Sequence, residues 1–252
     1  MKRTELSFLA LLLSLTLLLS GCSMMKQAPT SILKAQTPAD TQEGTAKTAK
    51  TARQGNAIVD DARTEPEQTT AASKAGTYAD NVYRNEFFGF QITLDDAWVN
   101  DSVQELNGPL LESQGASADQ SPDEIIDNMG LGNGLYMLNS GSLEKLGAIQ
   151  VMVTRIGVKG IALTMADELI DQLISQFSEA LPSAQVSKNS VRIGTDVFPA
   201  LYVANTISEA GEDIPVHMEQ VIIISEDYAA VIYLIAYYED NLDELVQYVS
   251  LL

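Results

Sequence analysis

The composition of the chain changes abruptly near Tyr78, and this change limits which part of the chain can form a core. Residues 23–77 are rich in Ala, Thr, Gln, Lys and Ser and contain no aromatic residue. A segment with so few bulky apolar side chains cannot bury enough surface to offset the entropy lost on folding. We therefore expect residues 22–79 to form a flexible tether and residues 80–252 to form the folded domain.

The first residues follow another pattern. Lys2 and Arg3 precede an apolar stretch over 8–19, and small residues lead to a cysteine. This arrangement is typical of a secretory signal, and the stretch is shorter than the roughly 20 residues that cross a bilayer. The run 19–22, Leu-Ser-Gly-Cys, resembles the lipobox of bacterial lipoproteins. The resemblance implies that residues 1–21 are removed and that Cys22 carries a diacylglyceryl anchor. An uncleaved signal anchor and an ordinary secretory signal are the alternatives.

Cys22 is the only cysteine in the chain. Once it carries a lipid, no thiol is left for a disulfide, for thiol catalysis or for a cysteine-ligated zinc site. Such a protein is expected at the cell membrane, lipid-anchored on the extracytoplasmic face, with the membrane as its first partner. The signal and its cysteine thus predict where the protein is located and say nothing about a reaction.

The charge is concentrated in the folded part. Residues 80–252 hold six Lys or Arg against twenty-seven Asp or Glu, a net charge of −21. This charge repels phosphate backbones and anionic lipid headgroups, so we expect no nucleic-acid partner and a domain that stands off the membrane. Net charge of this size favours a soluble monomeric domain. Attraction of cations or of a basic partner is the alternative interpretation.

Alternating and continuous apolar patterns predict an α+β domain. A helix begins at Ser121 with a proline and a glutamate in capping-box positions, and another over 164–181 has apolar residues at 3-4 spacing. A closing helix is expected to be capped by Asn241. Short links between successive strands favour antiparallel pairing. The predicted strands cover 84–88, 90–94, 135–139, 148–156, 185–193, 197–207, 214–225 and 228–238.

The aromatic residues at the start of the domain resemble the PsbP-like superfamily, which includes DcrB-type envelope lipoproteins. The matching residues are Tyr83, Asn85, the Phe-Phe-Gly-Phe run at 87–90 and the spacing from Leu94 to Trp98. The chain departs from the family pattern with aspartate at 95 and alanine at 97. The resemblance covers about residues 80–252 and implies an antiparallel sheet with helices packed on both faces. Members are often extracytoplasmic accessory or binding proteins, and they share no catalytic residues.

Several residues are candidates for a site. Asp95, Asp96 and Trp98 form the candidate binding site, either as a weak cation loop or as part of an aromatic platform. The alternative is that Trp98 and its neighbouring phenylalanines pack into the core. His217 is the only histidine, and no nucleophile-elbow motif accompanies it. The glycines at 130, 132 and 134 follow a predicted helix and therefore indicate a helix end rather than a phosphate loop.

The remaining acidic pairs lie mostly at helix starts and hairpin tips, where backbone capping explains them. We therefore predict no cofactor, no metal site and no catalytic residue. The expected function is a membrane-tethered, non-catalytic envelope lipoprotein that acts by binding or scaffolding, and an envelope protein is a candidate partner. The alternatives are a carboxylate-dependent hydrolase of envelope glycans, which needs a cleft with two facing carboxylates, and the solute-binding lipoprotein of a transporter, which needs a pocket at the sheet edge.

Overall fold

A computed structural model describes residues 72–114, 119–130, 133–156, 164–209 and 211–252 of the chain. The described residues belong to one compact unit. The predicted signal, the lipid site at Cys22 and most of the predicted tether lie outside the described residues. No helix in the described part is long and apolar enough to cross a membrane.

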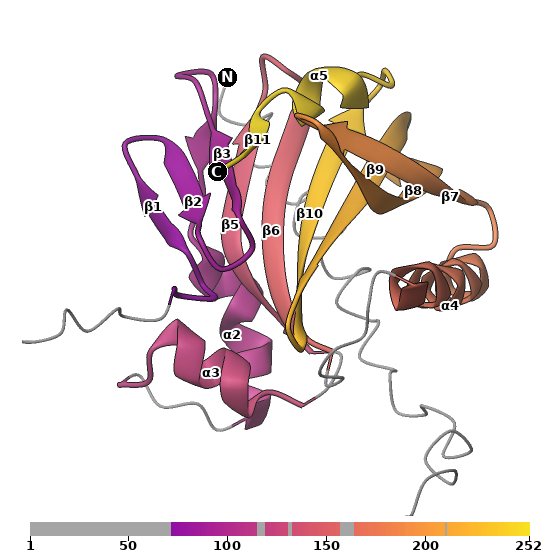
Figure 1. Ribbon diagram of the computed structural model, residues 1–252. Coiled ribbons are helices and arrows are strands. Elements are labelled where there is room, and N and C mark those ends of the chain that lie inside the picture. Colours follow the sequence, from indigo (N-terminus) through magenta and orange to yellow (C-terminus); the bar gives the residue numbers. More distant parts are fainter. Residues whose placement is uncertain (1–71, 115–118, 131–132, 157–163, 210) are drawn as a thin grey trace, which may run out of the picture. The chain divides into compact units, whose positions relative to one another are not determined.

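A seven-stranded antiparallel sheet forms the centre of the domain (Figure 1). Its strand order is β4-β5-β6-β10-β9-β8-β7, so the chain runs from one edge to the middle and returns from the other edge. In the middle of the sheet, residues 221–224 and 229–236 form almost continuous apolar runs, because both faces of the sheet are covered there. The strands are β4 (Val99–Asn100), β5 (Gly134–Ser142), β6 (Gly147–Arg155), β7 (Gln185–Ile193), β8 (Asp196–Glu209), β9 (Glu212–Ser225) and β10 (Tyr228–Tyr237).

A second, smaller antiparallel sheet covers part of one face of the large sheet. The residues around Phe90, Ile92 and Tyr83 in this sheet share one core with alternate side chains of β5, β6 and β10. The sequence predicted only two strands here and no separate sheet. The strands are, in spatial order, β1 (Thr77–Ala79), β2 (Val82–Asn85), β3 (Phe90–Thr93) and β11 (Val249–Leu251).

Helices lie on both faces of the large sheet, and the predicted α+β class is confirmed. Helices α3 (Pro122–Asn128) and α5 (Leu242–Val246) bury apolar residues in the core shared with the small sheet. Helix α4 (Thr164–Ala180) buries Ile170 and Phe177 against the other face. Helix α2 (Val103–Gln114) runs along β5 at the sheet edge, in a stretch that the sequence left unassigned.

Local signals predicted the helix ends unequally. Ser121 and Glu124 form the predicted capping box, each side chain accepting a hydrogen bond from the other's backbone N–H. Asn241 occupies the predicted N-cap position of α5, but its side chain makes no capping hydrogen bond, and its amide donates to the carbonyl of Lys145 instead. The strand predicted at 84–88 ends at Asn85, because the backbone turns there and Gly89 N–H donates to the Asn85 carbonyl.

Candidate functional site

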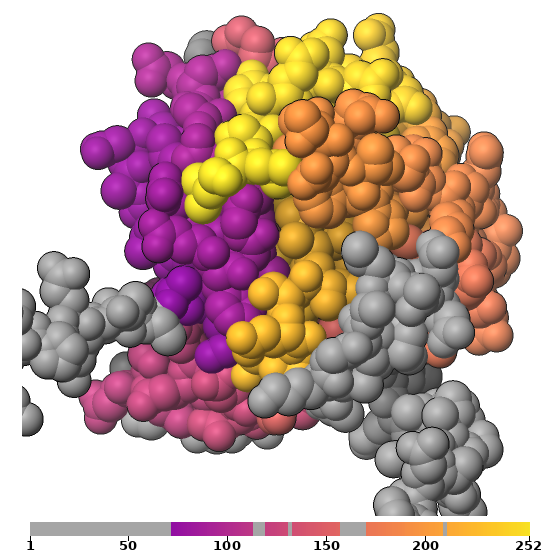
Figure 2. Space-filling model, viewed as in Figure 1, coloured from indigo at the N-terminus to yellow at the C-terminus, as the bar shows by residue number. Residues whose placement is uncertain are grey.

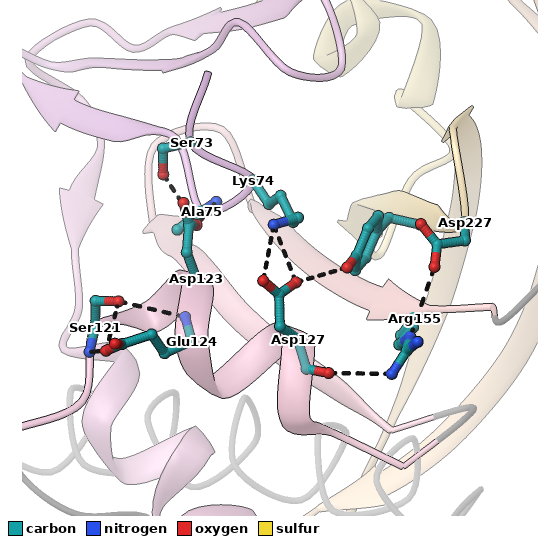
Figure 3. Close-up of polar contacts among 10 residues, drawn as sticks. Ser73, Lys74, Ala75, Ser121, Asp123, Glu124, Asp127, Arg155 and Asp227 are labelled. Atoms are coloured by element: carbon teal, nitrogen blue, oxygen red, sulfur yellow. Dashed lines mark hydrogen bonds and ion pairs between the residues drawn. The ribbon is translucent and has the colours of Figure 1, made fainter. Parts of the chain in front are cut away.

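The start of the described chain is held to the domain by a group of charged and aromatic residues, shown in Figure 3. We call Lys74, Asp127, Arg155, Asp227 and Tyr228 the proximal cluster. Lys74 Nζ lies 3.0 Å from Asp127 Oδ1 and 3.1 Å from its Oδ2, and Tyr228 Oη donates to the same carboxylate at 2.6 Å. The Lys74 ammonium also lies 5.0 Å from the centre of the Tyr228 ring, in cation–π contact. These contacts connect residues that are far apart in the sequence.

A second set of bonds ties helix α3 to the same place. Ser73 Oγ donates to Asp123 Oδ1 at 3.0 Å, and the Ala75 N–H donates to the same oxygen at 2.9 Å. Arg155 donates from a guanidinium nitrogen to the Asp127 carbonyl at 3.1 Å and lies 3.7 Å from Asp227. The end of the predicted tether is therefore built into the domain through α3 rather than hanging from it.

The charges in the proximal cluster are balanced by neighbours. Burial acts to raise the pKa of Asp127, but hydrogen bonds from Tyr228 and Lys74, with the charges of Lys74 and Arg155, outweigh it and lower the pKa. Burial, followed by the hydrogen bond to Asp127, raises the pKa of Tyr228. Asp127 thus stays ionised and Tyr228 stays neutral at neutral pH, so this pair is suited to holding the chain rather than to moving protons.

A cavity of about 270 Å³ lies beside the proximal cluster, between the small sheet, α2, α3 and β5. Val103, Leu111, Ile125 and Leu135 contribute apolar walls, and no Asp, Glu, His, Lys or Arg lines it. The backbone at 75–78 forms one side. Tyr83, which also lines the pocket, holds this segment in place, because its Oη donates to the Ala75 carbonyl at 2.8 Å. The pocket is therefore apolar and partly built by the residues through which the chain joins the domain.

Helix α2 is held at the pocket by a buried amide. Asn107 Nδ2 donates to the Tyr136 carbonyl and Asn107 Oδ1 accepts from the Tyr136 N–H, both at 2.8 Å. The strand pairing of β5 shifts register between Tyr136 and Leu138, which is the signature of a bulge. The amide therefore takes the place of a neighbouring strand at the bulge, and it fixes the distance between α2 and β5 that leaves the pocket open.

The single histidine lies in a polar group on the other half of the sheet. Tyr202 Oη is 2.9 Å from His217 Nδ1 and donates to Asp240 Oδ2 at 3.1 Å. Because a carboxylate only accepts, the tyrosine proton goes to Asp240, and His217 Nδ1–H donates to the tyrosine oxygen. Burial, with help from Asp240, raises the pKa of Tyr202 to about 12. The histidine is thus a partly buried residue whose polar contacts, within the described chain, are with Tyr202 and Asp240 and not with a serine or cysteine.

A buried carboxyl lies next to this group. Glu219 pairs with Tyr202 across β8 and β9 and is only 4% exposed. Its Oε2 accepts from Asn189 Nδ2 at 3.1 Å, whereas its Oε1 has no hydrogen-bond partner among the described residues. Burial, then the charges of Asp240 and Asp243, raises the pKa of Glu219. A glycosidase would place such a carboxyl in a cleft opposite a second one, but the pocket is lined by other residues.

The residues that the sequence singled out as a binding site are divided by the structure. Trp98 is buried and stacks edge-on against Tyr248, with 5.1 Å between the ring centres. Asp95 accepts from the Ala97 N–H and from Tyr248 Oη, both at 2.9 Å, while Asp96 is exposed. Within the described ranges, no three His, Cys, Asp or Glu residues are grouped so that they could hold a metal ion. A binding role for Asp95 and Asp96 stays a prediction.

The sequence did not reveal the pocket, the proximal cluster or the Glu219 group. Each is assembled from residues on separate elements, such as Lys74, Asp127 and Tyr228, whose individual patterns signal only a tether, a helix and a strand. The one usable signal was Glu219 itself, because an acidic residue within a strand of apolar alternation is uncommon in a core.

Comparisons with known proteins give a loose likeness of fold. No protein-family model matches the chain, and no curated protein matches it. A crystal structure of LpqN, a protein involved in cell envelope biogenesis of Mycobacterium tuberculosis, is similar with a TM-score of 0.33 and 13% identity, over 64% of this chain and 82% of that one. A crystal structure from Bacteroides thetaiotaomicron VPI-5482 has a TM-score of 0.35 and 12% identity, over 68% of this chain and 48% of that one. Neither likeness supports a conclusion about function.

Proposed function

We propose that this chain is a membrane-tethered, extracytoplasmic lipoprotein that binds a small apolar ligand and catalyses no reaction. The lipobox-like run ending at Cys22 supports the anchor, and the low-complexity stretch that follows supports a tether with a span on the order of 40 Å. The observation that carries the binding role is the apolar pocket of about 270 Å³ beside the proximal cluster.

The chemistry of the pocket favours a neutral ligand. Ligand pockets in proteins are mostly apolar and range from about 300 to 1,000 Å³, so this one lies at the small end. An apolar cavity of roughly 150 Å³ is enough to hold benzene, so the pocket has room for one substituted ring or a short branched chain. The absence of a charged side chain among its lining residues excludes recognition by ion pairing. These features support a role in binding, because no carboxylate, histidine or lysine lines the pocket to act as a general acid or base near neutral pH.

The solute-binding lipoprotein of a transporter is a second candidate, and the same pocket supports it. The pocket lies where the edge strand β1 and the strand β5 meet α2 and α3, the sheet-edge position that this function requires. The two candidates differ in what happens after binding, delivery to a transporter or retention. A carboxylate-dependent hydrolase gains no comparable support, because Glu219 and Asp240 lie outside the pocket.

The pocket is tested by isothermal titration calorimetry with the neutral one-ring probe p-xylene and the purified full chain. We expect the native protein to bind the probe and Ile125→Trp, which fills the pocket, to weaken binding about tenfold or more. Val197→Trp places the same ring on an exposed strand position away from the pocket and should bind like the native protein. Equal binding by native protein and Ile125→Trp, with both folded by circular dichroism, would contradict the pocket as the binding site.

The anchor is tested separately by incorporation of labelled palmitate in a bacterial host. The native chain should carry label and sediment with membranes, while Cys22→Ala should lack label and be released or retained as precursor. Ser20→Ala keeps a small residue before the cysteine and should behave like the native chain. An unmodified Cys22 sulfhydryl, found by mass spectrometry of the isolated native protein, would contradict the lipid anchor. It would not affect the result for the pocket.

A further inference from the structure

The end of the large sheet opposite the proximal cluster carries apolar side chains beside acidic ones. We call Leu143, Leu146, Tyr238, Glu239, Asp240 and Asp243 the distal patch. Its two segments are neighbours, because the Tyr237 N–H donates to the Leu146 carbonyl at 2.8 Å and Asn241 Nδ2 donates to the Lys145 carbonyl at 3.3 Å. Figure 2 shows the pink β5–β6 turn and the yellow residues around α5 together at the top of the molecule.

Two apolar residues of the distal patch are held in an unfavourable backbone conformation. Leu146 has φ +48° and Tyr238 has φ +71°, and their side chains are 40% and 48% exposed. Bulky residues seldom adopt this left-handed region, because their Cβ atom comes too close to the following carbonyl oxygen. The other positive-φ residues that are not glycine, Asp80, Asn81 and Glu226, are polar and lie in turns between paired strands.

Packing does not offset the backbone strain at Leu146 and Tyr238, because their exposed side chains bury little apolar surface in the core. Glycine or asparagine at these positions would remove the strain and keep the turn. The turn needs this backbone conformation but not a bulky side chain, so leucine and tyrosine at these positions point to a role for the side chains themselves. Here that role is to present two apolar groups to solvent at adjacent positions.

The acidic part of the distal patch lacks cationic partners. Asp240 is bonded only to Tyr202 and His217, and within the described chain no Lys or Arg forms an ion pair with it, with Glu239 or with Asp243. Lys145 in the adjoining turn lies 3.6 Å from Glu144, its own neighbour in sequence. Below this surface the buried Glu219 has an unpartnered oxygen and senses the charges of Asp240 and Asp243. The negative potential at this end is therefore left uncompensated by the protein itself.

We propose that the distal patch is a docking surface for a polypeptide segment of another protein that carries Lys or Arg beside an apolar side chain. The apolar side chain would cover Leu146 and Tyr238, and the cation would lie against Asp240 and Asp243. Charge complementarity is the argument for this occupant, because opposite charges across an interface favour encounter and register. A second copy of this chain brings the same negative charge, and an anionic membrane surface brings more of it.

The distal patch lies far from the place where the chain joins the domain. Strand β10 begins at Tyr228 in the proximal cluster and ends at Tyr237 beside the distal patch, a distance of roughly 30 Å for ten residues in extended form. In Figure 1 the two places correspond to the region of α3 at the bottom and of α5 at the top. Docking at the distal patch therefore leaves the pocket unobstructed, and it goes beyond the proposed ligand-binding function.

The test is a fluorescence anisotropy titration of the purified full chain with a labelled Gly/Ser-rich peptide that carries one Lys-Leu-Leu-Lys segment. Two matched peptides replace its lysines by glutamate or its leucines by serine. We expect the basic apolar peptide to bind and both matched peptides to bind at least tenfold more weakly, with an affinity that falls as salt is added. Equal binding of the glutamate peptide would overturn the proposal, because it would show apolar adhesion without charge recognition.

Variants place the binding on the surface. Leu146→Gly and Tyr238→Asn should each weaken the basic peptide about tenfold, as expected for a central apolar contact, without lowering the melting temperature. Glu239→Gln combined with Asp243→Asn should weaken it less and flatten the salt dependence. Val197→Ser removes an equally exposed apolar side chain elsewhere and should leave binding unchanged.

Three results would overturn the proposal. Native affinity in both Leu146→Gly and Tyr238→Asn would show that the peptide binds elsewhere. Concentration-dependent dimers in sedimentation of the native chain that disappear in Leu146→Gly would assign the surface to a second copy. Binding of the native chain, but not of Tyr238→Asn, to phosphatidylcholine vesicles would assign the surface to lipid.

Discussion

The two ends of strand β10 have opposite chemistry although they belong to one continuous buried strand. At the proximal end Tyr228 is buried, its hydroxyl donates to Asp127 and its ring faces Phe87 and Lys74. Just beyond the distal end Tyr238 is half exposed and is held at positive φ. The same residue type thus stabilises the fold at one end and is presented to solvent, at a cost, at the other.

The carboxyl groups near the two ends differ in the same way. Asp127 lies between Lys74 and Arg155, and its pKa is lowered by hydrogen bonds and positive charges that outweigh burial. Glu219 lies near Asp240 and Asp243, and its pKa is raised by burial and by their negative charges. The proximal end is therefore built for stability. The distal end keeps unpaired charge and backbone strain, which a surface with only a structural role would have lost.

The largest expected effect compares the two tyrosines directly. Tyr228→Ala removes a buried ring and its hydrogen bond and should lower the free energy of unfolding by about 3–5 kcal/mol. Tyr238→Ala removes an exposed ring and should change that free energy by about 0.5 kcal/mol or less. Urea denaturation of the two variants measures both values. Similar losses in the two variants would erase the distinction between the ends.

The next effect concerns Glu219. Because its pKa is raised, Glu219 is favoured in its neutral form by the folded state. The stability that the neutral carboxyl contributes is fully present below the pKa that Glu219 has in the unfolded chain. It is lost as pH rises through the pKa that Glu219 has in the folded protein. Glu219→Gln stays neutral and should exceed the native protein in stability by about 1–3 kcal/mol at neutral pH. The two proteins should converge in acid. Unfolding free energies measured from pH 4 to pH 8 provide the test, and a destabilised variant at pH 8 would contradict the assignment.

Asp127 should show the reverse pH dependence. Its lowered pKa contributes stability that is present above the unfolded pKa and is lost as pH falls through the folded pKa. Asp127→Asn should cost about 1 kcal/mol at neutral pH, a modest value because the side chain is 47% exposed and screened by solvent. The difference from the native protein should close in acid. Asp96→Asn, on an exposed loop, serves as the control with no expected change.

The smallest effect tests the strain at the distal end. Leu146→Gly relieves a positive φ and should raise the free energy of unfolding by at most about 1 kcal/mol. The melting temperature should rise accordingly. Leu143→Gly in the same turn relieves no such strain and should destabilise by a similar amount, because glycine adds freedom to the unfolded chain. Differential scanning calorimetry resolves the two signs. A loss of stability in Leu146→Gly would show that the leucine side chain supports the fold after all.

The sequence predicted the elements whose residues repeat over many positions. The long strands β6 to β10 and helix α4 carry patterns of nine residues or more, and the capping box at Ser121 is a local chemical signal. Two strands of the small sheet were predicted, but β1 and β11 were missed because they have only three residues each, too few for a period to show. Helix α2 was missed because Gly108 and Pro109 interrupt its pattern.

The candidate sites depend on pairings that no local pattern contains. The hydrogen bond from Tyr228 to Asp127 joins residues that are about 100 positions apart, and nothing in either segment identifies the other. Trp98 was predicted either to bind or to pack, and the structure buries it. The strain at Leu146 and Tyr238 is likewise a property of backbone geometry, because neither residue type signals a left-handed turn.

The pairing of β11 with β3 has a consequence for the order of folding. Val249 lies opposite Ile92, and the Leu252 N–H donates to the Gly89 carbonyl at 3.0 Å, so this ladder joins segments about 160 residues apart. The small sheet is complete only when strand β11 has paired with β3. Because contacts between residues so distant in sequence form slowly, we expect the small sheet to close late in folding, after the hairpins of the large sheet.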